Sequence, residues 1–205
     1  MNGKKFTGRN GCKAIVIGVS AGGVDALSRL FAELPANFSL PILTVQHIHS
    51  DERGVLAEFL NSLSTLTVKE AMDKEPVQSG HIYLAPPNYH LLVERGETLA
   101  LSVDDRVNYS RPSIDVLFES AATVWRERLI GVVLTGTNRD GASGLQRIHE
   151  LGGVTMVEDP KTAVYPIMPQ AALDATNVDL VLPLSEIGPA LIQLAHQSTG
   201  KEQEQ

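Results

Sequence analysis

Short apolar runs alternate regularly with segments of helical periodicity along this sequence, and this alternation is the feature that most limits the folds open to it. Residues 13–18 (KAIVIG) form a β-branched run, typical of a strand that is buried on both faces of a sheet. Residues 24–34 then carry leucine and phenylalanine at helical spacing, and Pro35 ends that helix. Strands separated by helices in this way predict an α/β domain with a mostly parallel sheet.

The same alternation extends through the rest of the chain. It predicts further strands at residues 41–46, 129–135, 154–158 and 178–182, and helices at residues 54–63, 113–127, 141–150, 169–175 and 184–196, with Ser113 as an N-cap. Residues 68–101 mix strand-like pieces with turn signals, which favours short strands and an antiparallel hairpin of residues 89–93 and 98–103. We therefore expect a doubly wound, mostly parallel α/β sheet with an antiparallel hairpin and helices on both faces.

Composition and charge narrow the class of protein further. The 205 residues, 43% hydrophobic and 20% charged, contain no repeat or low-complexity linker, so we expect one domain over residues 1–205 with a core from about 12 to 196. No run approaches the roughly 20 apolar residues of a membrane span, so we expect no membrane insertion. The single cysteine, Cys12, suits a reducing cytoplasm. The net charge of −7 is scattered along the chain, which argues against a nucleic-acid partner.

Polar and glycine-rich residues follow three of the predicted central strands. Ser20 follows the first strand, His47 the second, and Asp140 the strand that begins at residue 129. Parallel strands end at the same edge of a sheet, and ligand sites of such sheets form there. A serine, a histidine and an aspartate at one edge are the residue types of an acyl-transfer triad. We therefore predict a catalytic site built from these three side chains.

The loop that carries Ser20 is compatible with two kinds of site. Residues 18–22 (GVSAG) match the G-x-S-x-G pattern between a strand and a helix, where small residues allow a sharp turn that exposes the serine oxygen. The turn also places Ser20 at a helix N-terminus, where free N–H groups favour a developing negative charge. A phosphate- or dinucleotide-binding loop uses glycines at a helix start in the same way. On the loop alone, both alternatives stay open.

The end of the second strand favours a hydrolase. A dinucleotide site needs an acidic residue there for the ribose hydroxyls, whereas this chain has His47, with Asp51 only further along. An imidazole can take and return a proton near neutral pH, which a serine nucleophile requires. His49 is a competing base that the spacing does not favour. His81 and His90 fall in the hairpin region, and we do not expect them in the site.

Asp140 has the least independent support of the three residues. In a triad it would accept a hydrogen bond from Nδ1 of His47 and so leave Nε2 to face the serine. Alternatively, with Gly136 and Gly141 beside it, it only caps the helix that follows. The chain has neither a cysteine pair nor an H-E-x-x-H pattern, so we expect no metal site and no cofactor.

Five motifs make the chain resemble a known family. They are residues 17–23 (IGVSAGG), 45–47 (VQH), 80–90 (GHIYLAPPNYH), 111–118 (RPSIDVLF) and 134–141 (LTGTNRDG). Together they resemble the catalytic domain of CheB-type protein-glutamate methylesterases, over roughly residues 13–196. The resemblance assigns the family's serine, histidine and aspartate to Ser20, His47 and Asp140, the residues that the strand ends also indicate. It further implies that the backbone N–H of Thr137 contributes to an oxyanion hole.

This family hydrolyses glutamyl methyl esters on chemoreceptor signalling helices, and some members deamidate receptor glutamines. The resemblance therefore implies an acyl-enzyme on Ser20, a methyl-accepting chemotaxis receptor or related signalling protein as partner, and a cytoplasmic location. Family members often carry Thr after the serine and Met in the aspartate loop, where this chain has Ala21 and Thr137. They usually carry a receiver domain ahead of the catalytic one; about a dozen residues precede the first strand here, and we expect no receiver control within this chain.

Two questions stay open at this level. Arg111 and Arg139 are candidates to hold acidic groups of a receptor, and a solvated arginine or a helix-end cap is an equal alternative for each. A non-catalytic or differently targeted signalling module on the same fold is the alternative to an esterase. The intact set of serine, histidine and aspartate argues against that alternative.

Overall fold

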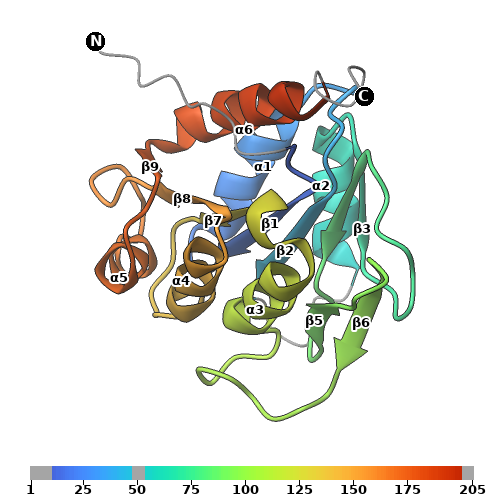
Figure 1. Ribbon diagram of the computed structural model, residues 1–205, viewed down its shortest axis with the longest axis horizontal. Helices are drawn as coiled ribbons and strands as arrows, with labels where there is room; N and C mark the ends of the chain where they lie inside the picture. Colours follow the sequence, from blue (N-terminus) through green and yellow to red (C-terminus); the bar gives the residue numbers. More distant parts are fainter. Residues whose placement is uncertain (1–10, 48–53, 200–205) are drawn as a thin grey trace.

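A single parallel sheet forms the centre of the protein, of which the computed structural model describes residues 11–47 and 54–199. Within these residues the sheet has seven strands in the order β3-β4-β2-β1-β7-β8-β9 (Figure 1). The strands are β1 (Ala14–Val19), β2 (Ile42–Gln46), β3 (Thr67–Glu70), β4 (His81–Leu84), β7 (Leu129–Val133), β8 (Val154–Glu158) and β9 (Leu180–Leu182). The helices are α1 (Gly23–Glu33), α2 (Val55–Leu63), α3 (Ile114–Trp125), α4 (Ala142–Glu150), α5 (Ile167–Ala175) and α6 (Leu184–Thr199), with a short 3₁₀ turn, Arg126–Arg128, after α3.

Strand β1 lies at the middle of the sheet, as its uninterrupted apolar sequence predicts. Every residue of β1, β2 and β7 is buried, because helices cover both faces of the sheet here. Val19 pairs with Gln46 of β2, and Gly18 pairs with Val133 of β7. Because all three strands run parallel in this register, the residues that follow them emerge side by side at one edge of the sheet.

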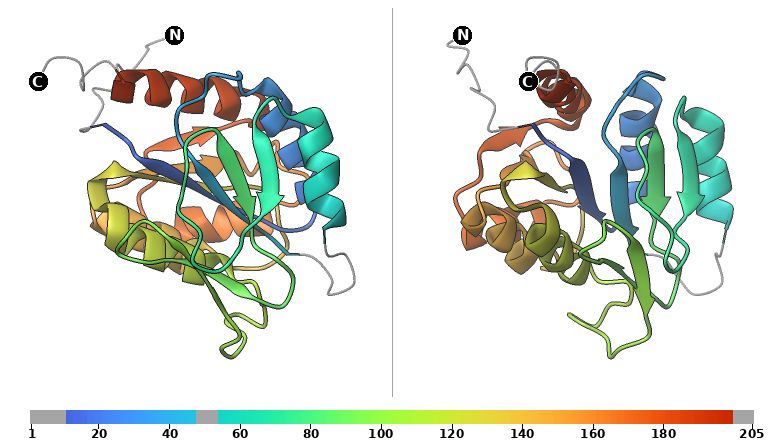
Figure 2. Two further views of the ribbon diagram at one scale, coloured as in Figure 1. Left: turned by 90° about the vertical axis from the view of Figure 1, so that its right-hand side faces the viewer. Right: turned by 45° about the vertical axis from the view of Figure 1, so that its right-hand side comes forward.

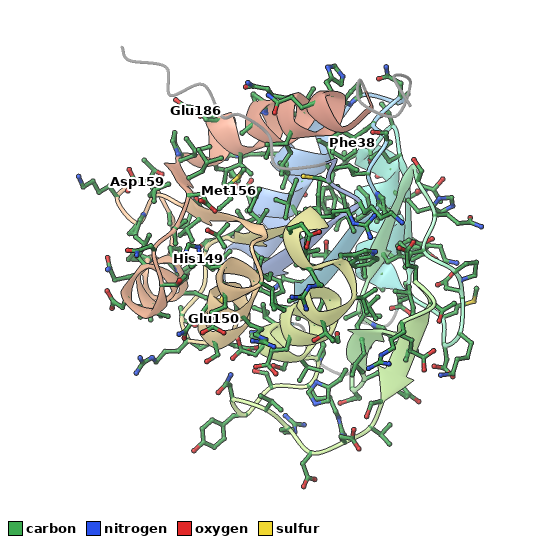
Figure 3. All side chains as sticks on the ribbon, in the orientation of Figure 1. Phe38, His149, Glu150, Met156, Asp159 and Glu186 are labelled. Carbon is green, nitrogen blue, oxygen red and sulfur yellow. The ribbon has the colours of Figure 1, made fainter. Side chains whose placement is uncertain are left out.

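Helices cover the two faces of the sheet in separate layers (Figure 2). One core cluster joins α1, α2 and α6 to the side chains of one sheet face, and Phe38 and Met156, labelled in Figure 3, belong to it. A second cluster joins α3, α4 and α5 to the opposite face, around Trp125. This arrangement confirms the predicted fold class, a doubly wound parallel sheet with helices on both faces.

The predicted antiparallel hairpin is also present, as β5 (His90–Val93) paired with β6 (Leu99–Ser102). It stands apart from the main sheet and packs against α3, where the N–H of Val93 donates to Ser120 Oγ at 3.2 Å. The short strands β3 and β4, by contrast, extend the main sheet in parallel. The segment between the hairpin and α3 lies beside the loop that follows β7, because Asn108 in this segment donates to Asp140.

Several element boundaries differ from the sequence prediction, among them the starts of α5 and β9. Helix α5 begins at Ile167 rather than Pro169, because a proline in the first helical turn lacks only an N–H that would have no partner there. Strand β9 begins at Leu180 rather than at residue 178, and its three residues pair only with the end of β8. The helices of the described residues are too short or too polar to span a bilayer. The same residues contain no group of three or more His, Cys, Asp or Glu side chains that could hold a metal ion.

Candidate active site

Ser20 occupies a tight turn between β1 and α1. Its N–H donates to Thr135 O at 3.0 Å, and its carbonyl accepts from the Gly23 N–H at 2.9 Å. Gly22 adopts a φ of 77°, which a residue with a side chain rarely does, and so permits the change of direction into α1. A Cβ on Gly23 would lie 1.9 Å from Gln46 Oε1, so the position has no room for a side chain. Gly22, the last glycine of the G-x-S-x-G segment, and Gly23 thus hold Ser20 at the carboxyl edge of the sheet.

His47 follows β2 directly and lies next to Ser20. Its N–H donates to Val19 O at 3.2 Å, which continues the pairing of β2 with β1. Its Nδ1 is 3.1 Å from Ser20 Oγ, and its Nε2 is 2.9 Å from Asp140 Oδ2. The structure therefore brings the three predicted side chains into one hydrogen-bonded chain.

The two ring nitrogens of His47 take the opposite places to those expected from the sequence. We expected Nδ1 to face Asp140 and Nε2 to face Ser20; the structure has Nδ1 facing Ser20 and Nε2 facing Asp140. The reason is the strand order. Ser20 is on the adjacent strand connection and is reached by the ring nitrogen nearest the backbone, whereas Asp140 follows β7, beyond β1, and is reached by the distal nitrogen. A carboxylate can only accept, so the proton of the neutral ring is on Nε2 and the Nδ1 lone pair faces Ser20.

Asp140 is completely buried, and five donors point at its carboxylate. Oδ2 accepts from His47 Nε2 and the Ile114 N–H (2.7 Å), and Oδ1 accepts from Ser113 Oγ (2.8 Å), Asn108 Nδ2 (3.0 Å) and the Asp115 N–H (3.1 Å). Burial by itself would raise the pKa of this carboxyl, but the hydrogen bonds from His47, Asn108 and the two N–H groups hold the pKa below its ordinary value. Asp140 is thus a carboxylate at neutral pH.

Asp140 does cap a helix, but not the one that follows it. The N–H groups of Ile114 and Asp115 begin α3, and Asp140 accepts from both, where the positive end of the helix dipole also favours its charge. Ser113, predicted as the cap of α3, uses its hydroxyl to donate to Asp140 instead. The alternatives of a cap and a histidine partner are therefore combined in one side chain.

Asp115 provides the cap that α4 would otherwise lack. Its Oδ1 accepts from the N–H groups of Gly141 (3.0 Å) and Gly144 (2.7 Å). Asn108 Nδ2 lies between the two carboxylates and donates to Asp115 Oδ2 at 2.8 Å and to Asp140 Oδ1 at 3.0 Å. Burial raises the pKa of Asp115, and the negative charge of Asp140 raises it further. The two helices thus cap each other through aspartates that are connected to the site.

His90 supports the site from a distance, although we expected it to lie outside. It is 2% exposed, its Nδ1 accepts from the Ser113 N–H at 3.2 Å, and its Nε2 donates to Asp105 O at 3.0 Å. His90 thereby holds the backbone of Ser113, whose hydroxyl binds Asp140. Its position in a hairpin suggested no such role, because the link depends on how the hairpin packs against α3.

Two amide side chains at the site were also missed. Gln46 Nε2 donates to Ser20 O and to His47 O, both at 2.9 Å, and so ties the two loops together. Asn138 Nδ2 lies 3.1 Å from His47 Nδ1, and its Oδ1 accepts from the Asp140 N–H at 3.0 Å. An asparagine that accepts from the N–H two residues on is an Asx turn, and the spacing of Asn138 and Asp140 was the available signal for it.

The remaining predicted positions differ in their surroundings. Ala21 follows Ser20 and Thr137 precedes Asn138 in sequence, and within the described part of the chain neither backbone N–H donates to an acceptor. Arg111 Nη1 donates to the carbonyls of Val103 (2.6 Å) and Asp104 (3.0 Å), so its role is to hold the loop before α3. Arg139 is exposed at the rim and borders a surface cavity next to α5. His49 and Asp51 lie outside the described residues.

A comparison with protein-family models shows to which family this site belongs. The model of the CheB methylesterase family matches residues 15–191. The chain belongs to the CheB methylesterase family. The match begins in β1 and ends in α6, so it includes Ser20, His47 and Asp140 as well as the hairpin and the loop before α3.

Individual relatives agree with this assignment. A protein of Leptospira interrogans, provisionally named protein-glutamate methylesterase/protein-glutamine glutaminase, is 50% identical over 182 residues, which are 89% of this chain and 94% of the relative. A protein of Caulobacter vibrioides with the same name is 42% identical over 187 residues; here the chain spans 54% of the relative's length. The CheB methylesterase catalytic domain of Thermotoga maritima superposes with a TM-score of 0.85 at 37% identity, covering 89% of this chain and 98% of that domain.

Proposed function

We propose that this chain is a protein-glutamate methylesterase in which Ser20 is the nucleophile, His47 the general base and Asp140 the group that orients the histidine. The observation that carries the proposal is the continuous hydrogen-bonded chain from Ser20 Oγ through the imidazole to a buried carboxylate. The names of its relatives support glutamyl methyl esters as substrates, and glutamine side chains as a second substrate. A chemoreceptor-type signalling protein in the cytoplasm is the partner that follows from this substrate.

The hydrogen bonds support a specific order of proton transfers. Ser20 Oγ attacks the ester carbonyl carbon while its proton passes to His47 Nδ1, which faces it. The tetrahedral intermediate then expels the methoxy group, which takes the proton from Nδ1 and leaves as methanol. Water attacks the resulting acyl-enzyme, gives a proton to Nδ1, and Ser20 recovers that proton as the glutamate is released. With a glutamine substrate, ammonia leaves in place of methanol.

Asp140 supports both halves of this cycle. It stays ionised because its hydrogen bonds hold its pKa below the ordinary value, and it accepts from Nε2 throughout. The carboxylate thus stabilises the imidazolium that forms when Nδ1 takes the proton. Its contacts with the first turn of α3 and with Ser113 restrict its rotation, so the imidazole is held in one orientation.

The oxyanion that forms in each half needs donors near Ser20. We assign the backbone N–H groups of Ala21, at the start of the α1 turn, and of Thr137, in the loop before Asp140. Both lie on loops that hydrogen bonds tie down: Thr135 Oγ1 donates to Ala21 O at 3.0 Å, and the Gly136 N–H donates to Tyr165 O at 3.0 Å. One such donor contributes about 10²–10³-fold to turnover in a serine protease.

Replacing Ser20 tests the proposal most directly. The Ser20→Ala variant removes the nucleophile and should lower methanol release from methylated receptor membranes by about 10⁶-fold, by analogy with a protease triad. A fluorophosphonate probe should label the wild-type protein and leave the variant unlabelled. Methanol release that survives in the folded variant would refute the assignment of Ser20. A folded wild-type protein that neither reacts with the probe nor releases methanol would favour a non-catalytic signalling module.

A further inference from the structure

Asn138 contacts the same nitrogen of His47 that faces Ser20. Its Nδ2 is 3.1 Å from His47 Nδ1, the same distance as Ser20 Oγ. A single imidazole lone pair therefore faces two neighbours, one of which is the proposed nucleophile. No step of the proposed reaction requires this second contact.

The orientation of the Asn138 amide is set by the backbone. The Asp140 N–H donates to Asn138 Oδ1 at 3.0 Å, so the oxygen must occupy that end of the amide. The end that faces His47 is then the NH₂ group, which can only donate. Turning the amide over would bring its NH₂ against the Asp140 N–H and its oxygen against the Nδ1 lone pair, and both hydrogen bonds would be lost.

We propose that Asn138 is a positioning residue that holds His47 in the neutral form with the proton on Nε2, by donating its amide N–H to Nδ1. The inference rests on the proposed function in one respect, namely that Nδ1 is the nitrogen that takes the Ser20 proton. The carboxylate of Asp140 requires a hydrogen on Nε2, and Asn138 requires a lone pair on Nδ1. The two residues, one on each side of the ring, thus specify the same tautomer.

The contact acts on the two charge states of the ring in opposite ways. In neutral His47, Nδ1 accepts from Asn138; in the imidazolium, two N–H donors face each other and the hydrogen bond is lost. Asn138 therefore disfavours the protonated ring and favours transfer of the proton onward to the leaving group. One neutral hydrogen bond corresponds to about half to one pH unit in such an equilibrium.

Within residues 11–47 and 54–199, the charged groups near His47 do not duplicate this effect. Asp140, at 2.9 Å, favours the imidazolium, and Asp115 lies behind it, joined through Asn108. Arg139 is exposed in the same loop as Asn138. Glu158 accepts from the Thr135 N–H, and Asp25 is paired with Arg29 on the surface of α1. Among the described residues, Asn138 places a group that can only donate against Nδ1, and this opposes protonation of that nitrogen.

Two substitutions separate the roles of the two ends of the amide. Asn138→Asp keeps an oxygen for the Asp140 N–H but places an acceptor, rather than a donor, against Nδ1. Asn138→Ala removes both groups. Arg139→Gln is the charge-matched control, because it makes the loop more negative by one charge, as Asn138→Asp does, at a neighbouring exposed position.

The decisive measurement is the titration of the His47 ring by ¹⁵N NMR in protein labelled at histidine nitrogen, with the signal identified from its loss in His47→Gln. The readout does not depend on turnover, so it tests the inference even if the chain hydrolyses no ester. We expect the titration midpoint to rise by about half to one pH unit in Asn138→Ala and by more than about one unit in Asn138→Asp. Arg139→Gln should move it by much less than either.

The acidic limb of the pH profile of ester hydrolysis should move with the NMR midpoints. A merely structural Asn138 would instead lower the rate equally at every pH and leave the midpoint of Asn138→Ala at the wild-type value. That result, or an Arg139→Gln shift as large as that of Asn138→Asp, would overturn the inference. Loss of activity in Ser20→Ala reports on the proposed function alone, so the two ideas can fail separately.

Discussion

Replacing Asp140 by asparagine should damage both activity and stability, because this carboxylate is at once the partner of His47 and the cap of α3. Three donors point at Oδ1 and two at Oδ2. The amide of Asp140→Asn can satisfy only one of these sides, and it will turn its oxygen to the side with three donors. Its NH₂ group will then face His47 Nε2 and the Ile114 N–H.

The consequence for activity follows from the tautomer. An NH₂ group at that position requires a lone pair on Nε2, so the proton of His47 moves to Nδ1 and the ring can no longer accept from Ser20. The same change in a serine protease lowers turnover by about 10⁴-fold, and we expect a loss of that order in methanol release. KM should change much less, since the aspartate does not contact the substrate.

The consequence for stability follows from the α3 N-terminus. The Ile114 N–H is buried and loses its acceptor, which costs about 1–3 kcal/mol in the free energy of unfolding. For a protein of this size, this corresponds to a melting temperature lower by roughly 5 °C. Ser20→Ala is the matched control, because its hydroxyl contacts His47 and no helix end, so it should lose activity at an unchanged melting temperature.

Calorimetry and ester hydrolysis on the two variants test this reasoning together. An Asp140→Asn protein that retains a tenth of the wild-type turnover would show that the carboxylate does not select the tautomer. If the melting temperature of Asp140→Asn equals that of Ser20→Ala, then Asp140 does not cap α3.

Three further predictions concern neighbouring positions. Gly23→Ala places a Cβ 1.9 Å from Gln46 Oε1, so we expect Gln46 to be displaced. The free energy of unfolding measured in urea should fall by about 1–3 kcal/mol, and turnover should decrease. An unchanged midpoint of urea unfolding would contradict this expectation. His90→Leu leaves the Ser113 N–H and Asp105 O unpaired, and should cost about 1–3 kcal/mol and lower kcat more than it changes KM; equal effects on both would argue against support of Asp140 through Ser113. Burial raises the pKa of Glu158, so the folded state binds its proton more tightly than the unfolded chain, and stability is lost as pH rises through the folded pKa. Glu158→Gln, which can still accept from the Thr135 N–H, should therefore gain stability relative to wild type between pH 4 and pH 8, and a difference independent of pH would refute this.

Local sequence patterns were sufficient for the elements and for the edge of the sheet on which the site lies. Buried parallel strands are continuous apolar runs, and the apolar positions of amphipathic helices repeat about every 3.6 residues. The order of elements can therefore be predicted from short stretches of sequence. The glycine turn at Ser20 is equally local. Because parallel strands share one direction, Ser20, His47 and Asp140 were expected at a common edge before any contact was known.

The hydrogen bonds that define the site belong to the tertiary structure. His47 and Asp140 are 93 residues apart in sequence, and which ring nitrogen meets which partner depends on β1 lying between β2 and β7. The buried donors to Asp140 come from Asn108 and from the start of α3, and they meet it only because α3 packs against α4. The orientation of the Asn138 amide depends likewise on the fold of the loop around the Asp140 N–H.

The sequence by itself thus determined the α/β fold, the family and the three residues at the edge of the sheet. The tertiary structure decided that Nδ1 rather than Nε2 faces Ser20, that Asp140 caps α3, and that Asn138 donates to His47. The physical reason is the range over which each property is encoded. Burial and turns repeat within a few residues, whereas the partners of a buried polar group are chosen by whichever segments the packed helices and strands bring within about 3 Å.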